Sequence, residues 1–282
     1  MTPPATNRDK LRRLAARANA WRVRGRYREA EQLFRQALAL AETELDPDDP
    51  ELVTILNNFG VLYKYMGRFE EANSLYNRAL TIVERTLGPD HPSIATLYHN
   101  LGGLEHARGC YAAGESLARR SLEIRERALG PDHVDVAADM AALAGILDGL
   151  KRYDESEPLY LRALSIFEAA YGPDHYEIAI NLNNLAALKS AQRKFGEAEP
   201  LYRRALAIKE MLLGLNHPDV ATTLNNLAVL LRSIGKPQEA AELYRRALVI
   251  YEQTLEPDHP KLVTCRQNYE GCHRETAKTD FK

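Results

Sequence analysis

The chain has 282 residues, of which 45% are hydrophobic and 27% charged, as is ordinary for a protein that folds in water. Its formal net charge of −2 argues against a dedicated nucleic-acid-binding protein, and its 3 cysteines are too few for a disulfide framework. The sequence shows neither an apolar signal segment at its start nor an apolar run long enough to span a membrane, so we expect a cytoplasmic protein.

A tract of the form LGPDHP recurs along the chain at a fixed stride of 42 residues. A fixed period in this range is typical of stacked repeats, in which each unit buries its apolar face only against its neighbours. Such an array offers a long one-sided surface instead of one deep catalytic pocket. The tracts begin at Leu45, Leu87, Leu129, Tyr171, Leu213 and Leu255.

Each repeat has the apolar spacing of two amphipathic helices joined by a short turn. In the sixth repeat, Pro218 suits the first helical position and His217 the N-cap position before it. Gly235 can take the left-handed conformation that ends the first helix. The second helix is then expected at about residues 238–255.

In chain order, we expect six helix pairs, about 8–45, 50–87, 92–129, 134–171, 176–213 and 218–255, and a capping helix at 260–277. These elements form a single solenoid, flanked by a disordered N-terminus (1–7) and a short tail (278–282). The last helix carries Arg266, Glu270 and His273 where the repeats carry apolar residues. A polar outer face is what a terminal cap requires.

The motifs of the sixth repeat resemble the tetratricopeptide repeat (TPR), and the stride, the LNNLA boxes and the GPDHP junctions are similar to the kinesin light chain subtype. The residues that carry the resemblance are Leu227, Ala228, Leu231, Gly235, Ala240, Tyr244 and Ala247. The resemblance implies an all-α, right-handed superhelical solenoid whose first helices line a concave groove. In that family, such a groove binds extended peptides or partner segments.

Pairs of asparagines in the first helices are projected onto this groove by the resemblance. Asparagine is a mediocre helix former, and its amide can pair with the backbone of an extended chain whatever the side chains of that chain are. The alternative is that one asparagine of each pair bonds a neighbouring helix and sets the stacking. The predicted groove residues are Asn57, Asn58, Lys64, His99, Asn100, Asn183, Asn184, Asn225, Asn226 and Arg232, and a further row comprises Thr54, Thr96, Thr222 and Thr264.

Repeat 4 interrupts the asparagine row with small residues, Ala141 and Ala142, and has Gly145 one turn further on. Small side chains at these positions predict a dent that accepts a bulky side chain of a bound peptide. Sequence drift after duplication explains the same residues equally well.

No metal site, cofactor or catalytic residue is predicted. Histidines recur once per repeat, but successive repeats are too far apart for them to share an ion, so we interpret them as junction residues. The phosphate-binding, metalloprotease, hydrolase and CxxC motifs do not occur in the sequence. The histidines are His91, His133, His175, His217 and His259.

These observations predict a protein-interaction scaffold or adaptor, not an enzyme, that binds a protein or peptide partner in its groove. A basic first repeat, together with Lys64 and Arg232, mildly favours a partner with acidic character. The alternative is a peptide-sensing regulatory module whose superhelix changes shape on binding. Neither nucleic acid nor a membrane is expected as a partner, and the sequence leaves the oligomeric state open.

Overall fold

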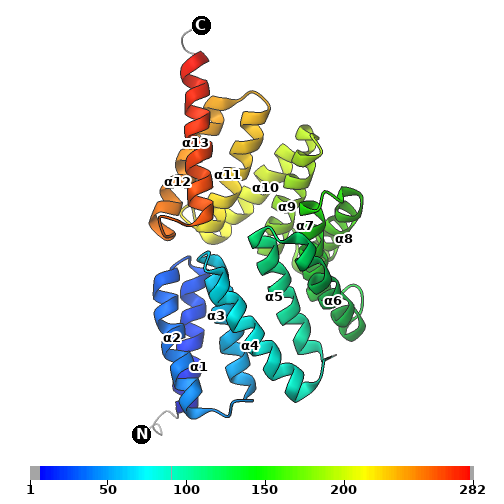
Figure 1. Cartoon of the computed structure of the whole chain (residues 1–282). Coiled ribbons are helices and arrows are strands. Elements are labelled where there is room, and N and C mark those ends of the chain that lie inside the picture. Colours follow the sequence, from blue (N-terminus) through cyan, green and yellow to red (C-terminus); the bar gives the residue numbers. More distant parts are fainter. Residues whose placement is uncertain (1–6, 90, 280–282) are drawn as a thin grey trace. The chain divides into compact units, whose positions relative to one another are not determined.

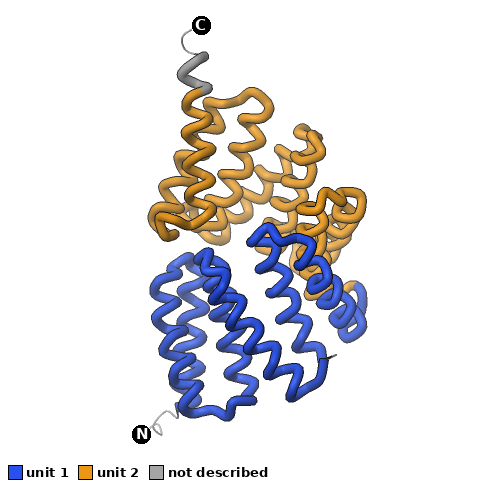
Figure 2. The backbone as a smooth tube through the Cα atoms, viewed as in Figure 1, with its two compact units in different colours: residues 1–131 blue, residues 132–282 orange. Residues whose placement is uncertain are grey.

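The computed structural model of the chain describes residues 7–89 and 91–279, with side chains up to Arg274. All regular secondary structure in this part is helical, in 13 helices that follow one another as antiparallel pairs plus a final helix. The helices fall into two compact units, Met1–Pro131 (unit 1) and Asp132–Lys282 (unit 2) (Figure 2). Residues 1–6 of the predicted disordered N-terminus and residues 280–282 of the predicted tail lie outside the described residues, whereas residues 7, 278 and 279 are helical. The single uninterrupted solenoid stays a prediction.

Unit 1 contains three helix pairs in which the second helix of each pair packs against the first (Figure 1). We call the first helix of each pair an A helix and the second a B helix. The predicted pairs are confirmed, with ends that agree within two residues. The helices are α1 (Asn7–Val23), α2 (Tyr27–Glu44), α3 (Pro50–Tyr65), α4 (Phe69–Leu87), α5 (Pro92–Arg108) and α6 (Tyr111–Leu129).

Unit 2 contains three further pairs and one additional A-type helix, α13, which packs on the last B helix. The predicted capping helix is therefore confirmed and extends to Thr279. The helices are α7 (Val134–Gly149), α8 (Tyr153–Tyr171), α9 (Tyr176–Ala191), α10 (Phe195–Leu213), α11 (Pro218–Ser233), α12 (Pro237–Thr254) and α13 (Pro260–Thr279).

The five repeated histidines are the N-cap residues of five A helices, as predicted for His217. The Nδ1 atom of each accepts a hydrogen bond from the backbone N–H two residues further on, for example from Asp219 to His217 over 3.1 Å. This bond satisfies one of the N–H groups that the first turn of a helix leaves without an intrahelical partner. Asp49 caps α3 in the same way, and His91, His133, His175 and His259 cap α5, α7, α9 and α13.

The A and B helices are not equivalent within a unit. Successive A helices contact one another directly, α1 with α3 and α3 with α5 in unit 1, and α7 through α9 and α11 to α13 in unit 2. A B helix packs mainly on its own A helix and on the next A helix, and contacts between successive B helices are sparser. Within each unit, successive A helices therefore lie closer together than successive B helices, and the position of the predicted groove residues on a concave side stays a prediction.

Aromatic side chains of the B helices fill the space between the two helices of a pair. They are fully or almost fully buried, so this series belongs to the core and is not an exposed stacking platform. On α13, Cys265 and Cys272 are buried free thiols that point toward backbone carbonyl groups. The aromatic series is Phe34, Tyr76, Tyr160, Tyr202 and Tyr244.

Candidate binding face

In unit 2, the predicted asparagines form a directional chain of hydrogen bonds along the A helices. Asn268 Nδ2 donates to Asn225 Oδ1 over 3.4 Å, and Asn225 Nδ2 donates to Asn226 Oδ1 over 3.4 Å. Asn226 Nδ2 then donates to Asn183 Oδ1 over 3.3 Å, and Asn183 Nδ2 to Asn184 Oδ1 over 3.2 Å. Because every second bond joins two neighbouring A helices, the amides help to fix the spacing of the repeats.

Unit 1 has a shorter chain that runs in the same direction. Asn100 Nδ2 donates to Asn57 Oδ1 over 2.7 Å, and Asn57 Nδ2 donates to Asn58 Oδ1 over 3.4 Å. The next register position before Asn58 is Ala15, and the one before Asn184 is Ala141, and neither offers an amide. Each chain of bonds therefore stops at an asparagine.

The two end amides keep a donor available. Among the described residues, neither Asn58 Nδ2 nor Asn184 Nδ2 donates a hydrogen bond, and both side chains are half-buried and reachable by solvent. Asn57, Asn225 and Asn226 are also half-buried, whereas Asn100 and Asn183 are buried. The alternative that asparagines bond neighbouring helices and set the stacking thus accounts for the bonds between helices. Contact with a ligand stays a prediction for the end amides, Asn58 and Asn184.

Two predicted cations cross from one A helix to the next on the same face. A Cβ added to Gly103 would lie 3.3 Å from Lys64 Nζ, and a Cβ added to Gly271 would lie 3.2 Å from an Arg232 guanidinium nitrogen. Glycine at these two positions leaves room for the long side chains. His99, the remaining predicted groove residue, is half-buried on α5.

The dent predicted in repeat 4 lies in a well-packed part of unit 2. Gly145 is buried, and Ala141 packs against a cluster formed by Ala144, Tyr160, Leu185 and Leu188. Ala142 is half-buried. Binding of a bulky ligand side chain at Ala141, Ala142 and Gly145 stays a prediction.

A pocket that the sequence did not reveal lies among α3, α4 and α5 of unit 1, at the junction between repeats 2 and 3. Its volume is about 310 Å³. Thr54 and Thr96 of the predicted threonine row line it, as does Asn57 of the amide chain. The described residues that line it are Asp48, Pro50, Val53, Thr54, Asn57, Val83, Thr86, Leu87, Ser93, Thr96 and Leu97.

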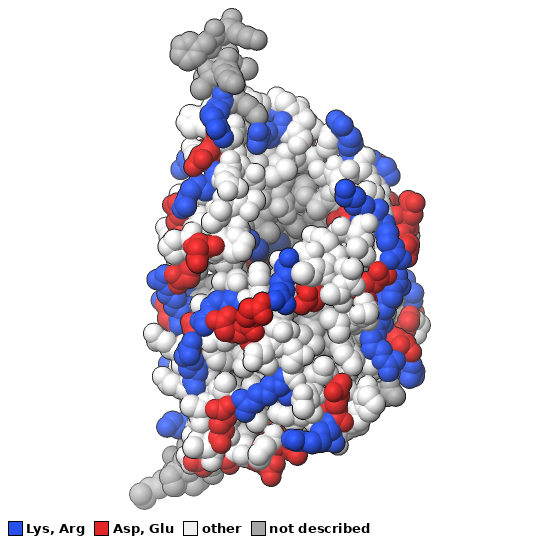
Figure 3. Space-filling view, in the orientation of Figure 1, with Lys and Arg blue, Asp and Glu red and all other residues white. Residues whose placement is uncertain are grey.

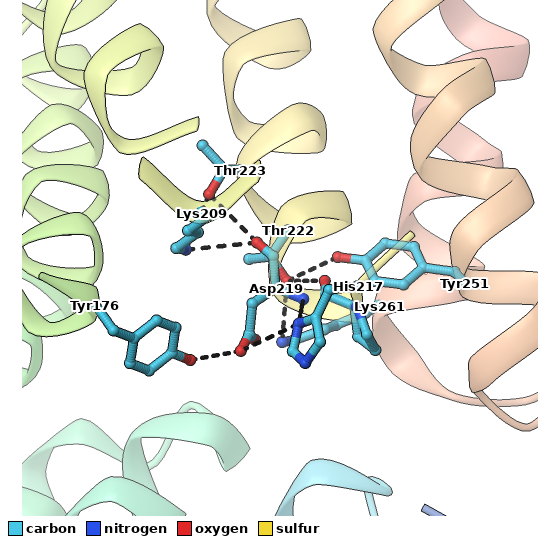
Figure 4. Close-up of polar contacts among 9 residues, drawn as sticks. Tyr176, Lys209, His217, Asp219, Thr222, Thr223, Tyr251 and Lys261 are labelled. Atoms are coloured by element: carbon cyan, nitrogen blue, oxygen red, sulfur yellow. Dashed lines mark hydrogen bonds and ion pairs between the residues drawn. The ribbon is translucent and has the colours of Figure 1, made fainter. Parts of the chain in front are cut away.

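A buried polar cluster occupies the junction between repeats 5 and 6 in unit 2 (Figure 4). Lys209 Nζ donates to Thr223 Oγ1 over 2.9 Å and to the backbone oxygen of Asp219 over 3.4 Å. Tyr176 Oη donates to Asp219 Oδ2 over 2.5 Å. Lys209 occupies a position of the repeat that carries a buried apolar residue, such as Val83 or Phe167, in other repeats. A charged residue at this position is the one feature from which the cluster could have been predicted.

Burial controls the ionisation of this cluster. Burial lowers the pKa of Lys209 to about 8, because the interior solvates an ammonium group poorly. Burial alone would raise the pKa of Asp219, but the charges of Lys209 and Lys261 hold this pKa below its ordinary value. Asp219 thus stays ionised, whereas Lys209 begins to lose its proton as the pH approaches 8.

Charges of both signs are mixed over the visible surface (Figure 3). Part of the basic charge of repeat 1 is neutralised inside unit 1, since Arg8 pairs with Asp49 and Glu51, and Arg12 also pairs with Glu51. In the described part of the chain, no group of three or more His, Cys, Asp or Glu side chains could hold a metal ion. None of its helices is long and apolar enough to cross a membrane.

Comparison with known proteins identifies the repeat. A family model described as tetratricopeptide repeat matches residues 13–85, 66–109, 93–155, 142–211, 177–253 and 219–280. The solved structure of BtubC (BKLC) from P. vanneervenii is 25% identical, with a TM-score of 0.55, over 88% of this chain and 94% of that chain. A kinesin light chain-like protein of Podospora anserina is 23% identical, with a TM-score of 0.52, over 74% of this chain and 98% of that chain.

A Rap protein complexed with Competence and Sporulation Factor shares the fold at 15% identity, with a TM-score of 0.64, over 97% of this chain and 77% of that chain. No curated protein sequence matches the chain.

Proposed function

Because the chain belongs to the tetratricopeptide repeat family, whose repeats are generally protein–protein interaction modules, we propose that it is a scaffold that binds a partner segment along its A helices. The observation that carries this proposal is the pair of amide chains, each of which ends at a half-buried asparagine with an unused donor. We propose no catalytic role for any residue.

The proposed mechanism follows from the chemistry of the amides. A backbone carbonyl of an extended segment can accept a hydrogen bond from Asn58 Nδ2 or Asn184 Nδ2 whatever its side chains are. The hydrogen bonds between neighbouring amides hold the side chains in place before binding, so that little conformational freedom is lost on binding. Lys64 and Arg232 on the same face favour a segment that also carries acidic residues.

The test uses a displayed library of random peptides, selected on the wild-type protein. Selected peptides are then titrated by calorimetry against wild type, Asn58→Ala and Asn184→Ala. Both substitutions remove an end donor but leave the bonds between helices, Asn100 to Asn57 and Asn226 to Asn183, in place. We expect the affinity to fall about three- to tenfold for each peptide that uses the altered donor, the value of one hydrogen bond.

Glu242→Gln is the matched control, because Glu242 is an exposed residue of a B helix, α12. It should leave the affinity unchanged. The proposal fails if no peptide is selected, or if the selected peptides bind both asparagine variants as tightly as wild type but lose affinity through changes on B helices.

A further inference from the structure

One register position of the B helices carries side chains of very different size at different junctions between repeats. In unit 2 this position carries Phe167, Lys209 and Tyr251, three long side chains that are all buried in their junctions. In unit 1 the corresponding residue of repeat 2 is the much smaller Val83. The pocket of about 310 Å³ at the junction of repeats 2 and 3 lies next to this residue.

The filled junction between repeats 5 and 6 shows which group such a space can take. The stem of Lys209 is buried there, and its Nζ bonds Thr223 and Asp219, which stand where Leu97 and Ser93 line the pocket of unit 1. A flexible side chain, mostly hydrocarbon, therefore occupies in unit 2 the place that Val83 leaves open in unit 1.

The lining of the open pocket determines the chemistry of its ligand. Its walls are the apolar side chains of Val53, Val83, Leu87 and Leu97. Among the described residues of the lining, Asp48 is the only charged one, and it is paired with Arg85. The charge of Asp48 is therefore already used in an ion pair. A charged side chain that entered the pocket would lose its hydration, and the apolar walls could not replace it.

Another hollow of unit 1, of about 360 Å³, is lined by Arg35, Glu42 and Glu71 among others. These groups are engaged in ion pairs, Arg35 with Glu31, Glu42 with Arg78 and Glu71 with Arg68. That hollow gives no comparable indication of a ligand.

We propose that the pocket between repeats 2 and 3 is a side-chain subsite, which takes one neutral branched-aliphatic or aromatic side chain of an extended partner segment. This proposal deepens the proposed function and rests on it. Asn57 connects the two features, because it lines the pocket and also donates to Asn58, whose own donor is unused. The backbone of the segment then lies at Asn58 while one of its side chains enters the pocket.

The probe is the blocked tripeptide acetyl-Ser-Leu-Ser-amide, and acetyl-Ser-Ser-Ser-amide is its control. Both are titrated into the full chain with labelled methyl groups, and binding is followed by the NMR shifts of the Val and Leu methyl groups. We expect saturable shifts of Val53, Val83, Leu87 and Leu97 with the leucine peptide and none with the serine peptide.

Two variants test whether the shifts come from the pocket. Val83→Phe introduces into repeat 2 the phenylalanine found at the corresponding position of repeat 4, Phe167. Because the new ring fills the cavity, binding of the leucine peptide should weaken at least about tenfold. Leu87→Ser alters a wall residue that is 51% exposed, so that folding is spared, and should weaken binding about fivefold. Val249→Phe, the same change at an exposed site on α12, should leave binding unchanged.

The proposal is overturned if the leucine peptide gives no saturable shifts, or if Leu87→Ser and a folded Val83→Phe protein bind it as wild type does. The two proposals can fail separately. If the leucine peptide binds in the pocket while no library peptide is selected, the subsite stands and the scaffold function falls. If library peptides depend on Asn58 but not on Val83, the function stands and the subsite falls.

Discussion

The junction between repeats 2 and 3 in unit 1 and the junction between repeats 5 and 6 in unit 2 stand at corresponding positions of the repeat but have opposite interiors. Val83 and Leu97 border an open pocket in unit 1. In unit 2 their counterparts are Lys209 and Thr223, which bond each other out of contact with water. The histidine caps and the stride of 42 residues are the same at both junctions.

This difference shows which features of the repeat are fixed by packing and which are free to vary. The caps and the inner aromatic residues recur because they define the helix pair, whereas the space between two pairs tolerates either a cavity or an ion. A buried ammonium is stable only while oxygen atoms replace its lost hydration. The comparison therefore predicts that the two junctions respond in opposite ways to the same kind of substitution.

The largest effect is expected from Thr223→Leu, which places at junction 5/6 the residue of junction 2/3. Lys209 would lose its hydroxyl acceptor at 2.9 Å and keep only the longer bond to Asp219. We expect the free energy of unfolding to fall by about 3 kcal/mol, as for a buried charge that loses its partner. Urea denaturation followed by circular dichroism measures this change.

The double variant Lys209→Val/Thr223→Leu serves as the control, since it recreates the apolar pair of junction 2/3. It should recover most of the lost stability. If Thr223→Leu is as costly in the Lys209→Val background as in wild type, the lysine is not the cause and the comparison fails.

The next effect concerns pH. Below about pH 8, Lys209 is protonated in both the folded and the unfolded chain. Between about pH 8 and the ordinary lysine value of 10.5, only the unfolded chain keeps the proton, so the free energy of unfolding rises with pH. From pH 8 to pH 9.5 the gain should reach up to about 2 kcal/mol, at 1.36 kcal/mol per pH unit.

The difference between wild type and Lys209→Met, measured by urea denaturation across this range, isolates the lysine from other titrating groups. Below about pH 7.5 the difference should be constant. A difference that stays constant up to pH 9.5, or that changes in the opposite direction, contradicts the assignment of a depressed pKa to Lys209.

The sequence predicted the fold well because short-range chemistry sets the ends of the helices. Pro218 and His217 fix where α11 begins, and the residue after its C-cap is Gly235 with a positive φ of 79°. These constraints act over a few residues and can be read without the structure. The same holds for the inner aromatic stripe of the B helices, which follows from helical periodicity.

The candidate site was predicted only in part. The positions of the asparagines came from the repeat register, but their bonding partners depend on the distance between neighbouring A helices. A one-residue offset makes Asn226 reach Asn183 in the preceding repeat, and no sequence rule supplies that offset. The pocket beside Val83 likewise depends on the combined volumes of side chains from three helices, α3, α4 and α5.

The smallest expected effect comes from a glycine that differs between the same two repeats. Repeat 2 has Gly60 where repeat 5 has Ala186, although both carry the buried tyrosine, Tyr76 or Tyr202. A Cβ on Gly60 would lie 2.6 Å from the Cε1 atom of Tyr76. The Tyr76 ring is fully buried, so it cannot move aside without disturbing its neighbours.

Gly60→Ala should therefore lower the free energy of unfolding by about 1–2 kcal/mol, because overpacking outweighs the better helix propensity of alanine. Gly102→Ala, at the corresponding position of repeat 3, is the matched control, since the nearest atom would lie at an ordinary 3.4 Å. It should raise stability by about 0.5–1 kcal/mol. Urea denaturation of both variants decides the matter, because an equal gain at both positions would mean that the Tyr76 ring can shift and that packing does not require the glycine.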